Sequence, residues 1–293
     1  MRRGRYYLGR VVKLGELDQR RLLDAIREPK IVNVGQFQWT FTDTVDATDS
    51  DDGFIFSRLS KYSQEGHVTV VDTATKSRRD SVAENLLIAS APFIYLPEYS
   101  GIAYLHVWNG IEEAVFRRRF SALIEETYDN FFVSCEIDPI SDYRAFVTKL
   151  KALDSFSEIR AKVHPPNPLF GDLWRDLNEY IKSRNASEVQ VAEKSDEKDG
   201  LTTELVKLIN AIVEERISDI PNPASLTDAA LLMAADGYGS GKVIGVAHSE
   251  TVIIRTSDTQ KSFLFDKEPM VEEIANEARK RFKAISKERD MQH

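Results

Sequence analysis

The sequence predicts an α+β fold with two mixed α/β regions, largely antiparallel sheets and a long C-terminal helix. Stretches rich in Tyr, Phe, Val and Thr, such as residues 5–12 and 37–45, are typical of strands. Other stretches, such as residues 201–218, carry Leu and Ile at helical spacing. Strand and helix patterns alternate through residues 131–193, and strand patterns return near the end of the chain, which indicates sheets packed against helices.

The individual elements follow from the same patterns. Strands are expected at residues 5–12, 37–45, 54–62, 67–73, 131–138, 158–164, 187–194, 242–249, 251–257 and 261–266. Helices are expected at residues 17–28, 80–90, 111–130, 141–153, 168–184, 201–218, 225–236 and 268–289. Residues 91–110 fit a hairpin that turns at Glu98 to Gly101, and Ser141 is a candidate N-cap. We expect an N-terminal α+β domain at residues 1–128 and a C-terminal α+β domain at residues 129–293.

The compartment follows from cysteine usage and from the apolar runs. A single cysteine, Cys135, excludes a disulfide framework within one chain and fits a reducing cytosol. The basic N-terminus is not followed by the apolar stretch of a signal peptide. The most apolar run, residues 86–96, has about half the length of a membrane span and contains Pro92. We therefore expect a cytoplasmic protein.

Charge is unevenly distributed along the chain. The net charge of −8 excludes a nucleic-acid binder that is basic throughout. Residues 1–30 nevertheless hold nine Arg and Lys against four Asp and Glu, and residues 279–289 hold six against one. Residues 43–52 hold five Asp and no base. A polyanion can bind one basic face of an acidic protein, because the field and counterion release are local; the alternative is an ordinary solvated surface.

The glycine-rich stretch DGYGSGKVIG, residues 236–245, does not fit a phosphate-binding loop. Aligned on its Gly-Lys step, it places Asp236 where a P-loop has glycine and Val243 where a P-loop has the metal-binding hydroxyl. It also follows a helix and precedes a strand, which is the reverse of the usual order. We expect Gly237 to end the helix and residues 239–241 to form a flexible turn, with Lys242 as a possible extra phosphate contact.

No other motif indicates catalysis or a metal. The five histidines are far apart in sequence, and Cys135 lies in an apolar strand. The acidic loop at residues 46–53 does not fit a calcium loop, because Leu59 stands where the bidentate Glu is needed. We expect no cofactor and no metal. A carboxylate pair assembled only in three dimensions stays open as an alternative.

Two basic segments remain as candidate binding sites. Residues 116–120, FRRRF, place three arginines on the outer side of a helix whose Phe side chains anchor it, unless the acidic residues of IEE and IEET pair with them. The last helix combines an apolar stripe with basic side chains in its final turns, which also complement the helix dipole. With the N-terminal arginines, the candidate phosphate contacts are Arg2, Arg3, Arg5, Arg117, Arg118, Arg119, Arg279, Lys280, Lys283 and Lys287.

The order of several short segments resembles the RexA-type phage-exclusion sensor proteins and related bacterial proteins. The segments are YYLGRVV, GFIFSRLSKY, FIYLPEYSGIAYL, FVSCEID, EIRAKVHPPNPLFGDL and EVQVAEK, which follow one another within residues 5–200. The most specific of them is PLFGDL, residues 168–173. The glycine-rich stretch of the last third has no counterpart.

The resemblance implies a cytoplasmic homodimer without enzymatic activity that binds double-stranded DNA with little sequence preference. It implies abortive infection as an antiviral defence, in which the protein signals phage infection to a membrane-embedded effector protein. We therefore expect a non-catalytic, sequence-nonspecific DNA-binding sensor. The alternatives are a nuclease-like, nucleic-acid-processing enzyme and a protein-interaction module that senses a phage protein.

Overall fold

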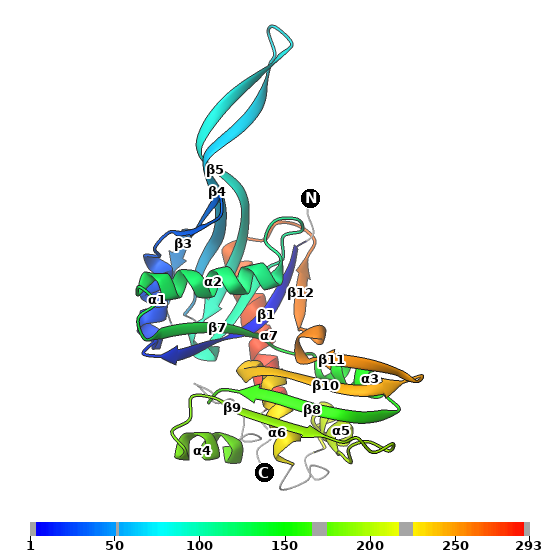
Figure 1. Cartoon of the computed structure of the whole chain (residues 1–293). Coiled ribbons are helices and arrows are strands. Elements are labelled where there is room, and N and C mark those ends of the chain that lie inside the picture. The colour runs from blue at the N-terminus through cyan, green and yellow to red at the C-terminus, as the bar shows by residue number, and fades with distance from the viewer. Residues whose placement is uncertain (1–3, 51–52, 166–174, 217–224, 290–293) are drawn as a thin grey trace.

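The computed structural model describes residues 4–50, 53–165, 175–216 and 225–289. In these residues, twelve strands form one eight-stranded and one four-stranded sheet, and every strand pair is antiparallel. Helices pack against both sheets, and a long helix follows the last strand (Figure 1). The α+β prediction is confirmed.

The eight-stranded sheet is organised around β1, which is paired along both edges. Its strands are β1 (Gly4–Gly15), β2 (Val32–Val34), β3 (Phe37–Asp46), β4 (Ile55–Asp72), β5 (Ser77–Leu96), β6 (Gly101–Leu105), β7 (Val133–Pro139) and β12 (Ser262–Phe265). One edge of β1 pairs with β6; the other pairs with β12 at residues 4–7 and with β7 at residues 9–15. Strands β7 and β12 lie beyond residue 128 but belong to the same sheet as β1. The division between the two sheets therefore does not coincide with the expected domain boundary at residue 128.

Helices cover both faces of this sheet. One face packs against α1 (Gln19–Arg27) and α2 (Glu113–Thr127), and the other packs against α7 (Val271–Arg289). Along β5, Phe93 and Tyr95 belong to the core under α1 and α2, whereas Ile94 and Leu96 belong to the core under α7. Alternate residues of a strand point to opposite faces, so a strand covered on both sides is apolar throughout. The expected hairpin is confirmed: β5 pairs with β6 across the short helix η1 (Pro97–Tyr99).

The outer halves of β4 and β5 leave the body as a two-stranded arm, residues 63–86 (Figure 1). The expected helix at residues 80–90 is wrong, because these residues pair with β4 as part of β5. The adjacent apolar residues Leu86, Leu87 and Ile88 are compatible with the periodicity of a helix and with that of a strand. The pairing with β4 makes them a strand. A register shift at Lys61 and Tyr62 marks the place where the arm leaves the body.

The four-stranded sheet has the strand order β11-β10-β8-β9. Its strands are β8 (Ser155–Val163), β9 (Val189–Lys194), β10 (Gly239–Ala247) and β11 (Glu250–Arg255). One face packs against α3 (Tyr143–Leu150), α4 (Arg175–Ser183), α5 (Leu205–Val213) and α6 (Leu226–Met233) in a single core. The other face, which we call the open face, carries no helix within the described part of the chain.

The glycine-rich stretch joins α6 to β10. Gly237 has a φ of +85° in the π-helical turn η4 (Ala234–Tyr238), so it ends the helix as expected. The flexible turn expected at residues 239–241 is wrong, because these residues begin β10. A Cβ atom at Gly239 would lie 2.0 Å from the carbonyl oxygen of Lys162, so only glycine allows this close approach to β8.

Several smaller expectations change. Asp142 caps α3 by accepting from Ala145 N, whereas the Ser141 hydroxyl donates to the Thr256 carbonyl oxygen at 2.6 Å. The first part of the helix expected at 168–184 lies outside the described residues, as does PLFGDL. Within the described residues, no helix combines the length and the apolarity needed to cross a bilayer.

Candidate nucleic-acid interface

Helix α2 presents its three arginines because its other side is anchored in the core. Phe116, Phe120, Leu123 and Ile124 are fully buried against the eight-stranded sheet. Arg118 is exposed on the outer side of the helix, and the flanking Arg117 and Arg119 are half-buried. The FRRRF segment therefore forms the anchored, outward-facing cluster that its spacing predicts.

The acidic residues around the arginines bind other groups. The carboxylate of Glu113 accepts from His106 Nδ1 at 2.7 Å, and Glu125 accepts from Ser134 Oγ and from Cys135 N. Glu126 accepts from the Asn130 amide. Within the described residues, no ion pair or hydrogen bond engages Arg117, Arg118 or Arg119. Among the described residues, the acids of IEE and IEET therefore form no salt bridge with these arginines, and the carboxyl that interacts electrostatically with Arg117 is that of Asp138 in β7.

The environment of Arg119 shows that this cluster is electrostatically unfavourable by itself. Its guanidinium carbon lies 5.4 Å from the centre of the Trp39 ring, in a cation–π contact. Partial burial and the positive charge of Arg118 lower the pKa of Arg119 from its usual value. The Nε atoms of Arg117 and Arg119 are shielded from water and have no hydrogen-bond partner.

The open face of the four-stranded sheet carries a second basic group, which we call the basic row. Arg255 of β11 pairs directly with Lys242 of β10, and Lys242 pairs directly with Arg160 of β8. Like charges directly opposite one another destabilise a sheet. One acid, Glu158, lies among them, 3.1 Å from Arg160 Nη2 and 3.3 Å from Lys242 Nζ. The row keeps an excess of two positive charges, which favours an anionic ligand.

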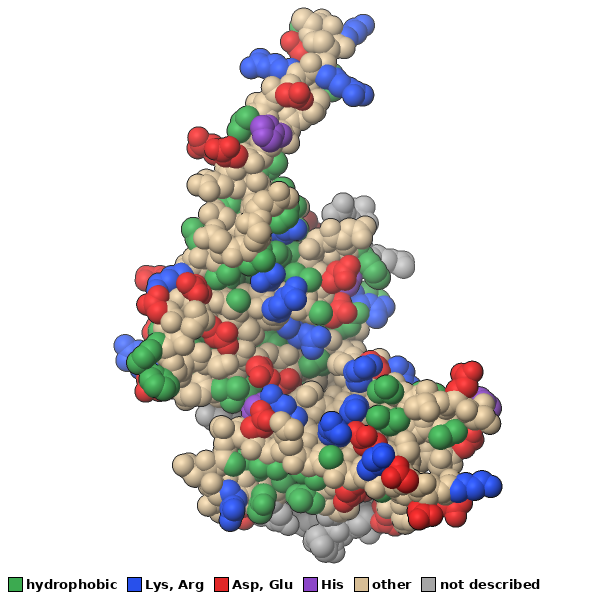
Figure 2. Space-filling model, in the orientation of Figure 1, with side chains coloured by type: hydrophobic (Ala, Val, Ile, Leu, Met, Phe, Trp, Pro, Cys, Tyr) green, Lys and Arg blue, Asp and Glu red, His purple; other side chains and the backbone are tan. Residues whose placement is uncertain are grey.

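The α2 arginines and the basic row lie on the same side of the molecule. Figure 2 shows Lys and Arg side chains over α2 and, below them, over β8, β10 and β11. Between these groups is Asp138 of β7, whose carboxyl interacts electrostatically with both Arg117 and Lys162. Burial raises the pKa of Asp138 to about 7, and the nearby Glu136 contributes to the rise. With a pKa of about 7, the carboxyl is about half ionised near neutral pH and offsets part of the positive charge of Arg117 and Lys162.

The structure does not bring all the predicted contacts to this side. Arg5 of β1 shares a strand face with Tyr7, which packs under α2. Arg5 therefore lies on the side of the molecule that carries α2, which we call the α2 side. Arg2 and Arg3 lie outside the described residues. The basic residues of α7 lie on the opposite face of the eight-stranded sheet.

Several of the α7 cations already have neighbours. Lys280 lies 3.9 Å from Glu277, and Arg279 donates to Asn276 at 3.3 Å. Lys283 and Lys287 are exposed and unpaired within the described residues. The C-terminal cluster is therefore a separate patch and not an extension of the α2 side.

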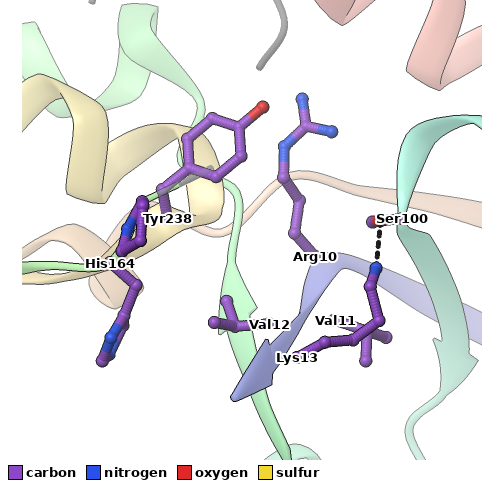
Figure 3. Close-up of a pocket in the computed structure, with 8 residues that line it drawn as sticks. Arg10, Val11, Val12, Lys13, Ser100, His164 and Tyr238 are labelled. Carbon is purple, nitrogen blue, oxygen red and sulfur yellow. Dashed lines mark hydrogen bonds between the residues drawn. The ribbon is translucent and has the colours of Figure 1, made fainter. Parts of the chain in front are cut away.

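The small cavity where the two sheets meet has an unusual set of polar groups (Figure 3). Arg10 is 2% exposed and donates to the carbonyl oxygens of Asp236 and Tyr99, and its guanidinium lies 4.8 Å from the Tyr238 ring centre. Lys13 donates to Ser100 Oγ at 2.7 Å, and burial lowers its pKa to about 8.

His164 completes the lining of this cavity. It is 3% exposed, and its Nδ1 lies 3.0 Å from the Ser187 carbonyl oxygen. The cavity volume is about 20 Å³, room for one water molecule, so it does not admit a nucleotide or a substrate of similar size. Arg10 and Lys13 have a structural role, because their hydrogen bonds tie β1 to the turn η4 and to Tyr99 and Ser100 at the turn between β5 and β6.

Metal and nucleophile candidates add nothing to the interface. In the described part of the chain, no group of three or more His, Cys, Asp or Glu side chains is placed to hold a metal ion. Cys135 is buried in β7, and burial raises the pKa of its thiol far above the usual value. The thiol is not a nucleophile near neutral pH.

The basic row is the feature that sequence analysis missed, apart from Lys242. Its signal lies in two expected strands, EIRAKVH and TVIIRTS, where Arg160 and Arg255 alternate with apolar residues and therefore point away from the core. The sequence does not show that these two strands lie on either side of the strand that carries Lys242.

Comparison with known proteins assigns the chain to a family. The model of a family described as Domain of unknown function (DUF4747) matches residues 19–215, more than half of the 293-residue chain. The match includes α1, the arm, α2, β7, β8 and the whole of α5, and it ends before β10. No curated protein matches the chain.

Proposed function

We propose that this chain, which belongs to the DUF4747 family, is a non-catalytic protein that binds double-stranded DNA without sequence preference. The observation that supports the proposal is the cluster of Arg117, Arg118 and Arg119, which forms no salt bridge with another described residue and lies on the same side as the basic row. Guanidiniums that lack acidic partners favour phosphate oxygens, which accept from them in bidentate geometry. These contacts read the backbone and not the bases, so binding is nonspecific.

The broader role that we propose is a sensor in bacterial antiphage defence of the abortive-infection type. It rests on the similarity of the segment order to the RexA-type phage-exclusion sensors. In this proposal the protein is cytoplasmic and homodimeric, and it passes the signal of infection to a membrane-embedded effector protein. In this proposal, the side of the molecule that carries the α2 arginines and the basic row contacts the DNA.

A duplex titration tests the DNA contact. Fluorescence anisotropy is measured with two unrelated duplexes of about 40 base pairs at about 50 and about 200 mM salt. We expect equal affinity for both sequences and an affinity that falls at least tenfold over this range, because bound phosphates release counterions. No binding at the lower salt concentration would contradict the proposal and favour a protein-interaction module that senses a phage protein.

Charge reversal on the two sides of the molecule locates the binding surface. Arg118→Glu together with Lys242→Glu and Arg255→Glu should weaken binding to both duplexes equally and reduce the salt slope by about 0.9 for each phosphate that the protein no longer neutralises. The control is Lys283→Glu with Lys287→Glu, compared per reversed charge, which changes exposed residues of α7 that have no ion-pair partner in the described part of the chain. If the control weakens binding as strongly as the triple variant, the α2 side is not the binding surface.

A separate assay tests whether the protein degrades nucleic acid. The DNA duplex and a single-stranded RNA are each incubated with the protein and Mg²⁺ or Mn²⁺. Intact nucleic acid is expected, and metal-dependent cleavage would replace the sensor by the nuclease-like alternative.

A further inference from the structure

A pocket lies where the loop between β6 and α2 meets the segment that leads into α7, and parts of β1, β4 and β5 complete its wall. Its volume is about 740 Å³. Sites for small molecules have volumes of roughly 300–1,000 Å³, so this pocket has the size that such a site needs. None of the α2 arginines and no member of the basic row lines it, so it is distinct from the surface that we propose for DNA.

The wall of the pocket combines apolar side chains with a few polar ones. Pro92, Leu105 and Pro269 supply apolar surface, whereas Ser90 and His106 supply polar groups. The Ser90 hydroxyl and the Nε2 atom of His106 have no hydrogen-bond partner within the described residues. The wall therefore favours a ligand that has apolar surface and also carries hydrogen-bond donors and acceptors.

Trp108 lines the mouth of the pocket, and at 80% exposure it is the most exposed large apolar side chain of the described residues. Its loop is fixed, because the amides of Gly110 and Ile111 both donate to the carbonyl oxygen of Val107 at 3.0 Å. Its ring meets the His106 ring edge to face, with 4.6 Å between the ring centres. An aromatic ring that is held in place and yet exposed is suited to stack on a planar ligand.

The charged groups at the pocket balance one another. Arg58 and Lys267 are the cations of the wall, and Glu268 is its carboxylate. Arg58 lies between two carboxylates, because its Nη2 is 3.8 Å from Glu268 Oε1 and its Nε is 3.4 Å from Asp43 Oδ2. Two cations thus face two anions, and this balance favours a ligand without net charge over a phosphate or a carboxylate.

We propose that this pocket binds a nucleobase, which stacks on Trp108. A nucleobase is planar and uncharged, and it carries its hydrogen-bond donors and acceptors along its edge. Its faces therefore suit the Trp108 ring and the apolar wall, and its edge suits the polar groups of Ser90 and His106. The base can belong to a free nucleoside or to an unpaired position in a nucleic-acid strand, since both present the same ring.

Other ligands of similar size match the wall less well. A monosaccharide carries hydroxyl groups around its whole ring and would bury several of them against Pro92, Leu105 and Pro269. A free aromatic amino acid would bring an ammonium and a carboxylate to a wall whose charges already balance. A base inside a duplex is stacked and paired, so it enters such a pocket only by leaving the helix. The inference therefore does not rest on the proposed binding of duplex DNA.

A ligand-observed NMR titration tests the pocket with adenosine, cytidine and uridine. At least one nucleoside should bind with a Kd below about 1 mM, and glucose should not bind at the same concentrations. Trp108→Ala should weaken nucleoside binding about tenfold or more, because the stacking contact is lost, whereas Trp108→Phe should keep most of the affinity. A wild type that binds no nucleoside, or equal binding by wild type and Trp108→Ala, would overturn the proposal.

Two short strands distinguish the two sources of the base. One strand has about five abasic positions, and the other carries a single base at its centre; both are titrated at about 200 mM salt to weaken phosphate contacts. If the base makes binding at least tenfold tighter than that of its nucleoside, and only when Trp108 is present, the pocket takes its base from a strand. Equal affinities of the strand and the nucleoside assign the pocket to free nucleosides.

Phe131→Ala is the matched control, because Phe131 is another aromatic residue, 70% exposed, that does not line the pocket. It should leave nucleoside binding unchanged, and a loss equal to that of Trp108→Ala would also overturn the proposal. Circular dichroism checks that each variant is folded. Duplex binding is measured separately and should be the same for wild type and Trp108→Ala, so this proposal and the DNA-binding proposal fail in different assays.

Discussion

The two sheets differ in how many of their faces are covered. The eight-stranded sheet is packed between α1 and α2 on one side and α7 on the other, whereas the four-stranded sheet has helices on one side only. Under the helices, Phe93 and Ile94 have no exposed surface. On the open face, the corresponding outward positions are Arg160, Lys242 and Arg255. Coverage thus decides whether a strand position contributes to stability or is available to a ligand.

The largest expected effect comes from the doubly covered sheet. Phe93 contacts the rings of Phe41, Phe116 and Phe120 at centroid distances of 5.2 to 5.7 Å. Phe93→Ala should lower the free energy of unfolding by about 3–5 kcal/mol, measured by urea denaturation, because it leaves a cavity among rigid rings. The control Ile253→Ala, on the open face, should change it by less than about 0.5 kcal/mol. Similar losses for both variants would contradict the comparison.

The second effect concerns Asp138, between the two sheets. Its folded pKa of about 7 lies above the usual 3.8, so the folded state holds the proton more tightly than the unfolded state does. The resulting stabilisation is complete below about pH 4 and is lost as the pH rises to about 7, a loss of up to about 4 kcal/mol. Asp138→Asn should therefore match wild type near pH 4 and exceed its unfolding free energy near pH 8. An equal difference at both pH values would show that Asp138 does not titrate in this way.

A smaller effect comes from the one acid within the basic row. Glu158→Gln removes the carboxylate next to Arg160 and Lys242. Duplex affinity at low salt should rise several-fold, because the row gains net positive charge. The unfolding free energy should fall by about 1 kcal/mol, because the repulsion across the strands is no longer offset. Anisotropy titration and urea denaturation measure the two changes, and a lower affinity would place the DNA away from this row.

The last expected effect is a difference in amide exchange within one strand pair, and it needs no mutation. β4 and β5 run from the doubly covered sheet into the uncovered arm, so the same pair of strands has two environments. In dilute protein, amides at residues 66–70 and 79–83 should exchange at least about a hundredfold faster than those at residues 55–59 and 93–96. Hydrogen-exchange mass spectrometry measures this difference, and uniform protection along both strands would show that the arm is covered.

The sequence predicted the elements better than it predicted their partners. The helix of FRRRF, the hairpin at residues 91–110 and the helix stop at Gly237 follow from local patterns, and all three are present. The arm was missed because residues 80–90 suit either a helix or a strand, and only their pairing with β4 decides. Local patterns contain no information about which distant segment lies alongside.

The candidate interface shows the same limit. The three arginines of α2 were predicted from three adjacent letters and one apolar stripe. Whether Glu113, Glu125 and Glu126 neutralise them depends on where His106, Ser134 and Asn130 lie, which the spacing of the acids does not reveal. The basic row needs three strands of known order, and the separation of the α7 cations from this side needs the location of a whole helix.

The pairing of β1 with β12 has a consequence for the synthesis of the protein. Residues 4–7 form their outer ladder with residues 262–265, so the first strand waits for nearly the whole chain before that edge is closed. At a translation rate of about 5–20 residues per second, the delay is on the order of tens of seconds. During that time residues 4–7 of β1 present an unpaired strand edge, and unpaired edges are sites at which chains can aggregate. Closure of this edge of β1 is therefore a late step in the folding of the chain, because it needs residues 262–265.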